Sequence, residues 1–254
     1  MRSRFRSDFA MPSPEIRPDR EPLTPDAVTA EPATEYRYSD ARPRTSHRFL
    51  LQAVEPFLRS LPSGSRVLDF GCGNGSLLAR FTDCGLELHG VDASKSGISQ
   101  ARQHHRAIVF HIGDVTAPMP PDLAQVRFDA IVCTEVVEHV FDPRKLLRNI
   151  FALLKPGGQL LITTPYHGYL KNLALAAAGH MDAHYTALWD HGHIKFFSRR
   201  TLSALLEEAN FEELRFSGAG RAPFFWKSMV FLARKPGGGR GLAQDGSLPG
   251  GRRA

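Results

Sequence analysis

The sequence predicts an α/β fold with a mostly parallel sheet that carries helices on both faces. Short apolar runs of strand length alternate with amphipathic stretches between residues 46 and 233, and a glycine-rich turn follows the first apolar run. Hydrophobic residues make up 42% of the 254 residues, which is enough for one sizeable core. We therefore expect a single α/β domain with additional segments at its ends.

Five apolar runs have the length and the uninterrupted hydrophobicity of buried parallel strands. They are RVLDF at 66–70, LELHGVD at 86–92, AIVFHIGD at 107–114, FDAIVCTE at 128–135 and GQLLITTP at 158–165. Two further β-rich stretches, at 212–218 and 226–233, complete the predicted domain.

The stretches around these runs have helical character. We expect helices at 46–60, 75–83, 94–105, 142–154 and 199–209. The fourth helix is expected to stop at Lys155-Pro156-Gly157-Gly158, because proline and glycine do not continue a helix.

Composition divides the chain into three parts. Residues 1–43 contain seven of the 18 prolines and are expected to form a disordered arm, and residues 236–254 contain seven of the 22 glycines and are expected to form a flexible tail. The domain is expected at 44–235. Within it, residues 166–197 interrupt the strand and helix alternation after the fifth strand, where a loop lines the ligand crevice of an open α/β sheet. We expect this insertion to be a substrate lid.

The net charge of +6 does not lie on one folded face. Residues 1–47 carry eight basic and eight acidic side chains, residues 48–233 carry 19 and 17, and residues 234–254 carry five and one. Because the core is nearly neutral, nucleic acid is not expected as a partner.

No apolar run approaches the ~20 residues that a membrane-spanning helix needs, so no transmembrane segment is expected. The three cysteines, Cys72, Cys84 and Cys133, form no paired motif of the metal-binding type and cannot make an even set of disulfides. We therefore expect a reducing, cytoplasmic environment.

The turn after the first strand is the clearest candidate ligand site. It reads Asp69-Phe-Gly71-Cys-Gly73-Asn-Gly75, and such a turn lets the backbone approach a ligand closely. The dinucleotide pattern G-x-G-x-x-G would require glycine at position 76 or 78, where the chain has serine and leucine. Asp92 ends the second strand, where a carboxylate can accept hydrogen bonds from ribose hydroxyls, and Asp114 ends the third.

VLDFGCGNG, GVDAS, GDV, FDAIVCTEVVEHV and LLKPGGQLLITTP, in this order and spacing, resemble a class I S-adenosylmethionine-dependent methyltransferase. The resemblance covers about residues 46–233 and implies a Rossmann-like seven-stranded sheet whose last strand is antiparallel. It further implies that S-adenosylmethionine lies over Gly71, Gly73 and Gly75. Asp69 would help to hold the methionine amino group, Asp92 the ribose and Asp114 the adenine.

A second candidate site follows the fourth strand, where CTEVVEHVFDP places Glu135, Glu138 and His139 together. Two carboxylates and an imidazole suit a divalent cation such as Mg²⁺, Mn²⁺ or Zn²⁺. The segment resembles the E-x-x-E-H of ubiquinone-biosynthesis O-methyltransferases and of small-RNA 2′-O-methyltransferases. That resemblance implies His191 as a fourth ligand, with His193 as an alternative. Without a metal, His139 or His191 is the expected general base, with Glu138 beside it.

The acceptor is expected to bind at the lid. Tyr166, Tyr169, Tyr185 and Trp189 either line an aromatic pocket or pack the lid itself. Residues 173–179 are expected to form a buried lid helix, although contact with a membrane surface is an alternative. Phe224, Phe225 and Trp226 are expected in the core.

The expected reaction is methyl transfer to an oxygen of a small-molecule, lipid or glycan acceptor. The alternatives are methylation at nitrogen or carbon, and a non-catalytic module that binds S-adenosylmethionine.

Overall fold

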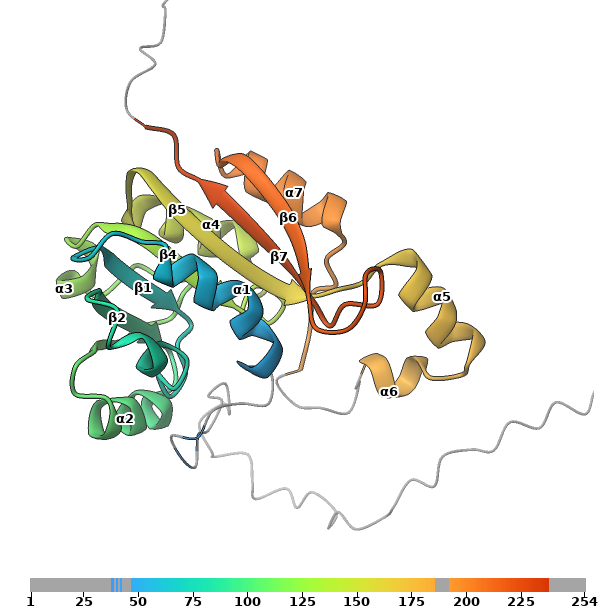
Figure 1. The fold of residues 1–254 in the computed structure, drawn as a ribbon, viewed down its shortest axis with the longest axis horizontal. Helices are drawn as coiled ribbons and strands as arrows, with labels where there is room; N and C mark the ends of the chain where they lie inside the picture. The colour runs from blue at the N-terminus through green and yellow to red at the C-terminus, as the bar shows by residue number, and fades with distance from the viewer. Residues whose placement is uncertain (1–37, 39, 41, 43–46, 186–191, 238–254) are drawn as a thin grey trace, which may run out of the picture. The chain divides into compact units, whose positions relative to one another are not determined.

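The computed structural model describes residues 38, 40, 42, 47–185 and 192–237. Their core is one seven-stranded sheet with the order β3-β2-β1-β4-β5-β7-β6 (Figure 1). Strand β7 pairs antiparallel with both β5 and β6, whereas the other pairings are parallel. The expected sheet, with its antiparallel last strand, is confirmed.

The strands lie where the apolar runs predicted them. Their bounds are β1 Arg66–Phe70, β2 Glu87–Asp92, β3 Val109–Ile112, β4 Phe128–Thr134, β5 Leu154–Pro165, β6 Glu212–Ala219 and β7 Ser228–Arg234. Strand β5 starts earlier than expected, because the Lys-Pro-Gly-Gly segment that ends the preceding helix is already extended.

Five helices surround the sheet. They are α1 His47–Arg59, α2 Lys95–His104, α3 Pro121–Ala124, α4 Pro143–Leu153 and α7 Arg199–Glu208. Side chains cap several of their starts: Ser94 accepts from the amide of Gly97, and Asp142 accepts from the amide of Lys145.

The helix expected at 75–83 is wrong in extent, because only a short 3-10 turn, η2 Leu78–Phe81, forms there. Gly75 has a φ of +73° and Gly85 a φ of +68°, both outside the helical region.

Two apolar clusters cover the two faces of the sheet. One cluster packs α4 and α7 against strand residues such as Leu68, Ile131 and Ile162. The other cluster packs α1, α2 and η2 against strand residues that are adjacent in sequence to those of the first cluster, such as Val67 and Val132. Because successive strand side chains point to opposite faces, each central strand serves both clusters. The sheet is therefore buried on both sides, as a parallel sheet requires.

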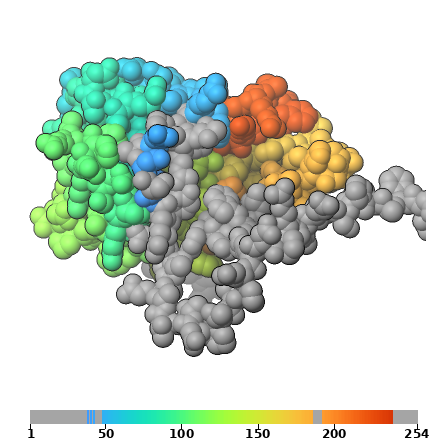
Figure 2. All heavy atoms as spheres, turned by 90° about the horizontal axis from the view of Figure 1, so that it is seen from below, coloured from blue at the N-terminus to red at the C-terminus, as the bar shows by residue number. Residues whose placement is uncertain are grey.

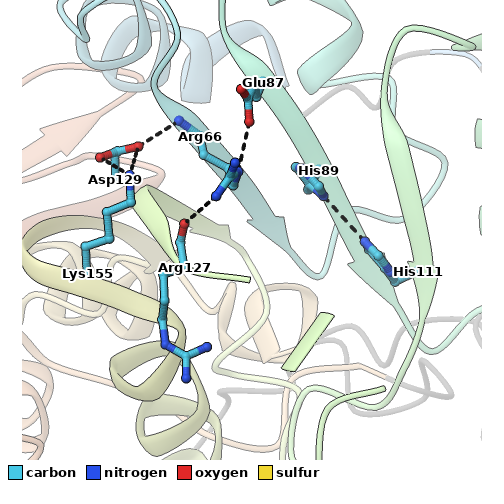
Figure 3. A network of polar contacts seen from close by, with 7 residues as sticks. All are labelled: Arg66, Glu87, His89, His111, Arg127, Asp129 and Lys155. Atoms are coloured by element: carbon cyan, nitrogen blue, oxygen red, sulfur yellow. Dashed lines mark hydrogen bonds and ion pairs between the residues drawn. The ribbon is translucent and has the colours of Figure 1, made fainter. Parts of the chain in front are cut away.

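A polar network joins the starts of the central strands (Figure 3). The carboxylate of Asp129 accepts from the Arg66 amide and from the Lys155 ammonium, while the Arg66 guanidinium pairs with Glu87. This network lies at the amino ends of β1, β2 and β4. It leaves the carboxyl ends of these strands for ligands.

The insertion forms two short helices, α5 Tyr169–Ala177 and α6 Met181–Tyr185, beyond the carboxyl end of β5 (Figure 1). The expectation of a buried helix here is wrong: Tyr169 is 96% exposed and Leu173 68%, while Lys171 is the buried residue of α5. Phe224 and Phe225 are also exposed rather than in the core. Within the described ranges, no helix is long and apolar enough to cross a membrane.

Candidate functional site

Two turns lie side by side at the carboxyl ends of the central strands. The glycine-rich turn follows β1 and the Glu-His turn follows β4, and these two strands are neighbours. The chain order along the sheet reverses at this point, which is where open α/β sheets bind ligands. The turns are in contact, because a side chain on Gly71 would collide with the side chain of Val136.

The glycine-rich turn has the backbone that its sequence predicts. The φ angles are +92° at Gly71, +54° at Gly73 and +73° at Gly75. Residues that carry a side chain rarely adopt such positive values. The amides of Gly71 and Cys72 donate to the carbonyl of Val91 and so join the turn to the end of β2.

Asp92 holds the turn from its other side. Its Oδ2 accepts from the Gly73 amide at 2.8 Å, and its Oδ1 accepts from the Ser94 amide at 2.8 Å. The carboxylate that sequence reasoning assigned to a ribose is therefore fixed beside the glycine-rich turn. Its role toward a ligand stays a prediction.

Asp69 and Asp114 have different environments. Asp69 is buried, and burial together with the nearby charge of Asp92 raises the pKa of its carboxyl to about 8. Asp114 is exposed, and its Oδ1 accepts from the amide and the hydroxyl of Thr116. Asp69 lies near the carboxyl end of β1 and Asp114 just after β3, and their predicted contacts with a cofactor stay predictions.

The second turn brings three metal-ligand types together. One ligand atom from each of Glu138, His139 and His193 lies within 4.8 Å of the others. The rings of His139 and His193 meet edge to face at 4.9 Å between their centroids. Both carboxylate oxygens of Glu138 are buried and lack a hydrogen-bond partner among the described residues.

Backbone hydrogen bonds explain how residues so far apart in sequence meet. The amides of Ile194 and Lys195 donate to the carbonyl of Glu138 at 2.9 and 3.0 Å. The Nδ1 of His139 lies 3.1 Å from the carbonyl of Gly192. Since a carbonyl only accepts, this nitrogen carries the proton of the neutral ring, and Nε2 is left with its lone pair.

Electrostatics also favours a ligand in this cluster. Burial, reinforced by the neighbouring charge of Glu135, raises the pKa of Glu138 well above its usual value. Burial and the neighbouring imidazoles of His139 and His184 lower the pKa of His193 to about 4, so this ring is neutral near neutral pH. Glu138 and the imidazoles of His139 and His193 form a set of donors that fits a divalent cation such as Zn²⁺ or Mn²⁺.

Glu135 is not part of the described cluster. It has a φ of +55°, and its carboxylate accepts from the Thr163 hydroxyl at 2.7 Å. The predicted ligand His191 and the predicted pocket residue Trp189 lie outside the described residues. His193, which the sequence offered only as an alternative, takes the position beside His139.

Sequence reasoning placed Tyr185 among aromatic residues of the lid but missed the other described members of its group, His167, His184 and Phe196. The ring of His167 contacts His184, Tyr185 and Phe196, with centroids 5.2, 6.4 and 5.2 Å away. Burial and the charge of His184 lower the pKa of His167 to about 4. Of the tyrosines proposed for a pocket, Tyr185 joins this group and Tyr166 packs on Trp226 instead. Only the clustering of aromatic residues in the insertion signalled it.

Comparison with known proteins gives a consistent result. A family model described as a methyltransferase domain matches residues 41–215. The chain is 35% identical over 170 residues to the ubiquinone biosynthesis O-methyltransferase of Bradyrhizobium sp. (strain ORS 278), covering 64% of each. It is 39% identical over 128 residues to that of Caulobacter sp. (strain K31), covering 50% of this chain and 49% of that protein.

Most of these curated relatives are matched over about half of their own length, the values running from 42% to 68%. Among solved structures, an S-adenosylmethionine-dependent methyltransferase of Thermotoga maritima superposes with a TM-score of 0.55 at 20% identity. That match covers 74% of this chain and 91% of the other, and at this identity it supports the fold.

Proposed function

The chain belongs to the methyltransferase-domain family, and on this premise we propose that it transfers a methyl group from S-adenosylmethionine to an oxygen of a small-molecule acceptor. The single observation that carries the proposal is the contact between the two turns. Gly71 of the glycine-rich turn packs against Val136 of the Glu-His turn. A methyl donor held at the first turn and a hydroxyl held at the second would then be neighbours, and alignment of this kind supplies much of the rate in a displacement reaction.

The cofactor would lie over Gly71, Gly73 and Gly75, with Asp92 on its ribose, Asp114 on its adenine and Asp69 near its amino group. Support for this assignment comes from the open glycine backbone and from the position of Asp92 beside it. Replacing Asp92 with Ala should weaken the binding of S-adenosylhomocysteine by about 10- to 100-fold, because charge-assisted hydrogen bonds are lost. Isothermal titration calorimetry measures this change. Unchanged affinity, or tight binding of NAD, would contradict the assignment.

Glu138, His139 and His193 would hold a divalent cation. The sequence suggested Glu135 and His191 as ligands as well, but the Glu135 carboxylate already accepts a hydrogen bond from Thr163. The buried, unpartnered carboxylate oxygens of Glu138 support this part of the proposal. When bound, such a cation would lower the pKa of the acceptor hydroxyl.

The residues of this chain have separate tasks in the proposed reaction. Without a bound cation, the Nε2 of His139, whose Nδ1 proton faces the Gly192 carbonyl, is the candidate acceptor of a proton from the hydroxyl. Glu138 lies 4.0 Å from this nitrogen and would orient the ring. The lid would exclude water while the methyl group is transferred.

Removal of metal tests the cation directly. Methyl transfer should fall with EDTA and return with Zn²⁺, Mn²⁺ or Mg²⁺, whereas binding of S-adenosylhomocysteine should be unaffected by EDTA. If His139 acts only as a base, EDTA should have no effect, and the defect of His139→Ala should shrink at high pH as the acceptor ionises unaided.

The surroundings of the second turn favour an apolar acceptor over a glycan. Phe141 is 86% exposed, and Ile194 and Phe196 are also exposed close to the cluster in sequence. Leu173 and Tyr169 add exposed apolar surface on the lid. Surface of this kind is typical of a binding region for apolar ligands or for a membrane interface. A lipid-like acceptor, reached through peripheral contact with a membrane, fits it.

Acceptor identity requires a direct experiment. The purified enzyme should be incubated with metabolite and lipid extracts and with S-adenosylmethionine that carries a deuterated methyl group. Mass spectrometry should then find the label as a methyl ether. A label on nitrogen or carbon would support the alternative chemistry, and cofactor binding without any labelled product would support a non-catalytic binding module.

A further inference from the structure

We propose that Lys171 of the lid binds an acidic group of the methyl acceptor, a carboxylate or a phosphate. This inference rests on the proposed function and narrows it, because it adds a second chemical feature to the acceptor. The hydroxyl that receives the methyl group would lie at the Glu-His turn. The acidic group of the same molecule would reach the ammonium of the lysine.

Lys171 is buried on a helix whose neighbouring side chains face solvent. Tyr169, Leu170 and Leu173 of α5 are exposed, whereas Lys171 is only 9% exposed. Burial of an ammonium is costly unless an opposite charge or several hydrogen bonds compensate for it. The position of this side chain therefore calls for a partner.

The described residues satisfy the ammonium of Lys171 only in part. Its Nζ donates to the carbonyl of Tyr166 at 2.8 Å, which uses one of its three hydrogens. The ion pairs among the described residues do not include Lys171. Two hydrogens of the ammonium thus remain for the oxygens of a ligand.

The charges around Lys171 favour an acidic ligand over a neutral or a basic one. Burial, and then the positive charge of Arg221, lower the pKa of Lys171, and the charge of Glu135 raises it. The carboxylate of Glu135 already accepts from the Thr163 hydroxyl, so it is engaged elsewhere. Figure 2 shows the orange-red segment between β6 and β7, which carries Arg221 in sequence, beside the gold surface of the lid helices.

Two imidazoles of the lid lie near the lysine and offer further hydrogen bonds. The Nδ1 of His167 and the Nε2 of His184 are buried and have no hydrogen-bond partner among the described residues. His167 directly follows Tyr166, whose carbonyl accepts from Lys171. Either nitrogen can donate to an anion when it carries the proton of the neutral ring. Buried polar atoms of this kind need a partner, and an acidic ligand supplies one.

This group adjoins the acceptor half of the site. Tyr166 is the residue after β5, and Thr163 near the end of the same strand holds the first residue of the Glu-His turn through two hydrogen bonds. A molecule whose hydroxyl lies at that turn can therefore extend along the end of β5 to Lys171. An acceptor with an apolar body and one acidic end fits both this group and the exposed apolar surface of the lid.

Binding of small probes to the full-length chain tests the inference. Benzoate and phenyl phosphate carry the two candidate acidic groups, and benzamide is a neutral molecule of nearly the same shape as benzoate. Ligand-detected NMR should show that the wild type binds at least one of the two anions about tenfold more tightly than benzamide, because a charge-assisted hydrogen bond forms. The anion with the larger preference identifies the acidic group.

Lys171→Gln removes the charge but keeps a donor for the Tyr166 carbonyl, so it should lose the preference for the anion. Lys171→Arg, which keeps the charge, should retain most of it. Lys145→Met is the matched control, because it removes the same charge from a side chain that is 57% exposed on α4, and it should behave as the wild type. If Lys171 only fastens the lid to Tyr166, Lys171→Gln should keep the preference.

The outcomes separate this inference from the proposed function. A wild type that does not prefer either anion over benzamide, or a preference that survives in Lys171→Gln, would overturn the inference and leave the proposed function standing. A deuterated methyl product without a carboxylate or phosphate would do the same. Failure of the wild type to bind S-adenosylhomocysteine would overturn the proposed function, and with it the role of the anion in methyl transfer.

Discussion

The two halves of the site satisfy their polar groups in opposite ways. In the cofactor half, which comprises residues 71–75 and Asp92, the carboxylate is already bonded to the amides of Gly73 and Ser94. In the acceptor half, which comprises Glu138, His139 and His193, the buried oxygens of Glu138 have no hydrogen-bond partner among the described residues. Such groups are costly to bury and persist where they serve a ligand. The first half therefore holds a ligand mainly through the shape of its backbone, whereas the second half offers unsatisfied polar atoms that can take part in a reaction.

The largest effect should come from Glu138. Glu138→Gln keeps the size of the side chain but cannot carry charge, so methyl transfer should fall about 10²- to 10⁴-fold while affinity for S-adenosylhomocysteine is retained. Steady-state rates and calorimetry on the same preparation measure both quantities. A parallel loss of cofactor affinity would show that the two halves are not separate.

Glu135→Gln is the matched control for this substitution. The Glu135 carboxylate already accepts from the Thr163 hydroxyl, and a glutamine oxygen can accept the same hydrogen bond. Its rate should therefore fall far less than that of Glu138→Gln. An equal fall would mean that Glu135 is a ligand, as the sequence alone suggested.

An intermediate effect is expected at Asp69, which precedes the cofactor half in sequence and is buried without a hydrogen bond to its Oδ1 among the described residues. Asp69→Asn should raise the free energy of unfolding at pH 8 by about 1–3 kcal/mol, because a buried charge is no longer required. The same variant should bind S-adenosylhomocysteine more weakly, since it loses the carboxylate proposed to face the amino group. Denaturation in urea and calorimetry test the two expectations.

The pH dependence of this gain has a definite sign. Burial raises the pKa of Asp69 to about 8, so between its ordinary value and pH 8 the folded protein holds a proton that the unfolded chain has released. Stability of the wild type therefore falls as pH rises through this window and levels off above it. The advantage of Asp69→Asn should be small at pH 5 and largest near pH 8. A gain that does not change with pH would show that Asp69 is ionised in the fold.

The sequence anticipated the cofactor half better than the acceptor half, for a physical reason. Residues 71–75 are contiguous, and Asp92 follows the next strand, so local spacing is enough to bring them together. His193 reaches His139 only through backbone bonds from Ile194 and Lys195 to Glu138, which no local pattern encodes.

The sequence pattern also failed to predict which residues of the lid are buried. The apolar residues of α5 predicted a buried helix, yet Leu173 faces solvent and Lys171 is buried, where it donates to the carbonyl of Tyr166. A short apolar stretch indicates that a surface will be covered but does not indicate what covers it. This exposure led us to favour an apolar acceptor.

The smallest effect should come from an ion pair that lies outside both halves of the site. It gives a reference with which the larger effects can be compared. Arg144 on α4 and Glu208 on α7 form two short hydrogen bonds, of 2.6 and 3.0 Å, but their side chains are 59% and 51% exposed. Exposed ion pairs contribute little even with good geometry, because water and salt screen them. A double-mutant cycle with Arg144→Met and Glu208→Gln should give a small coupling energy that disappears in 1 M NaCl. Rates and cofactor affinity should stay at wild-type values, because neither residue belongs to a strand end that forms the site. A large coupling energy that persists in 1 M NaCl would mean that this pair is not screened as its exposure requires.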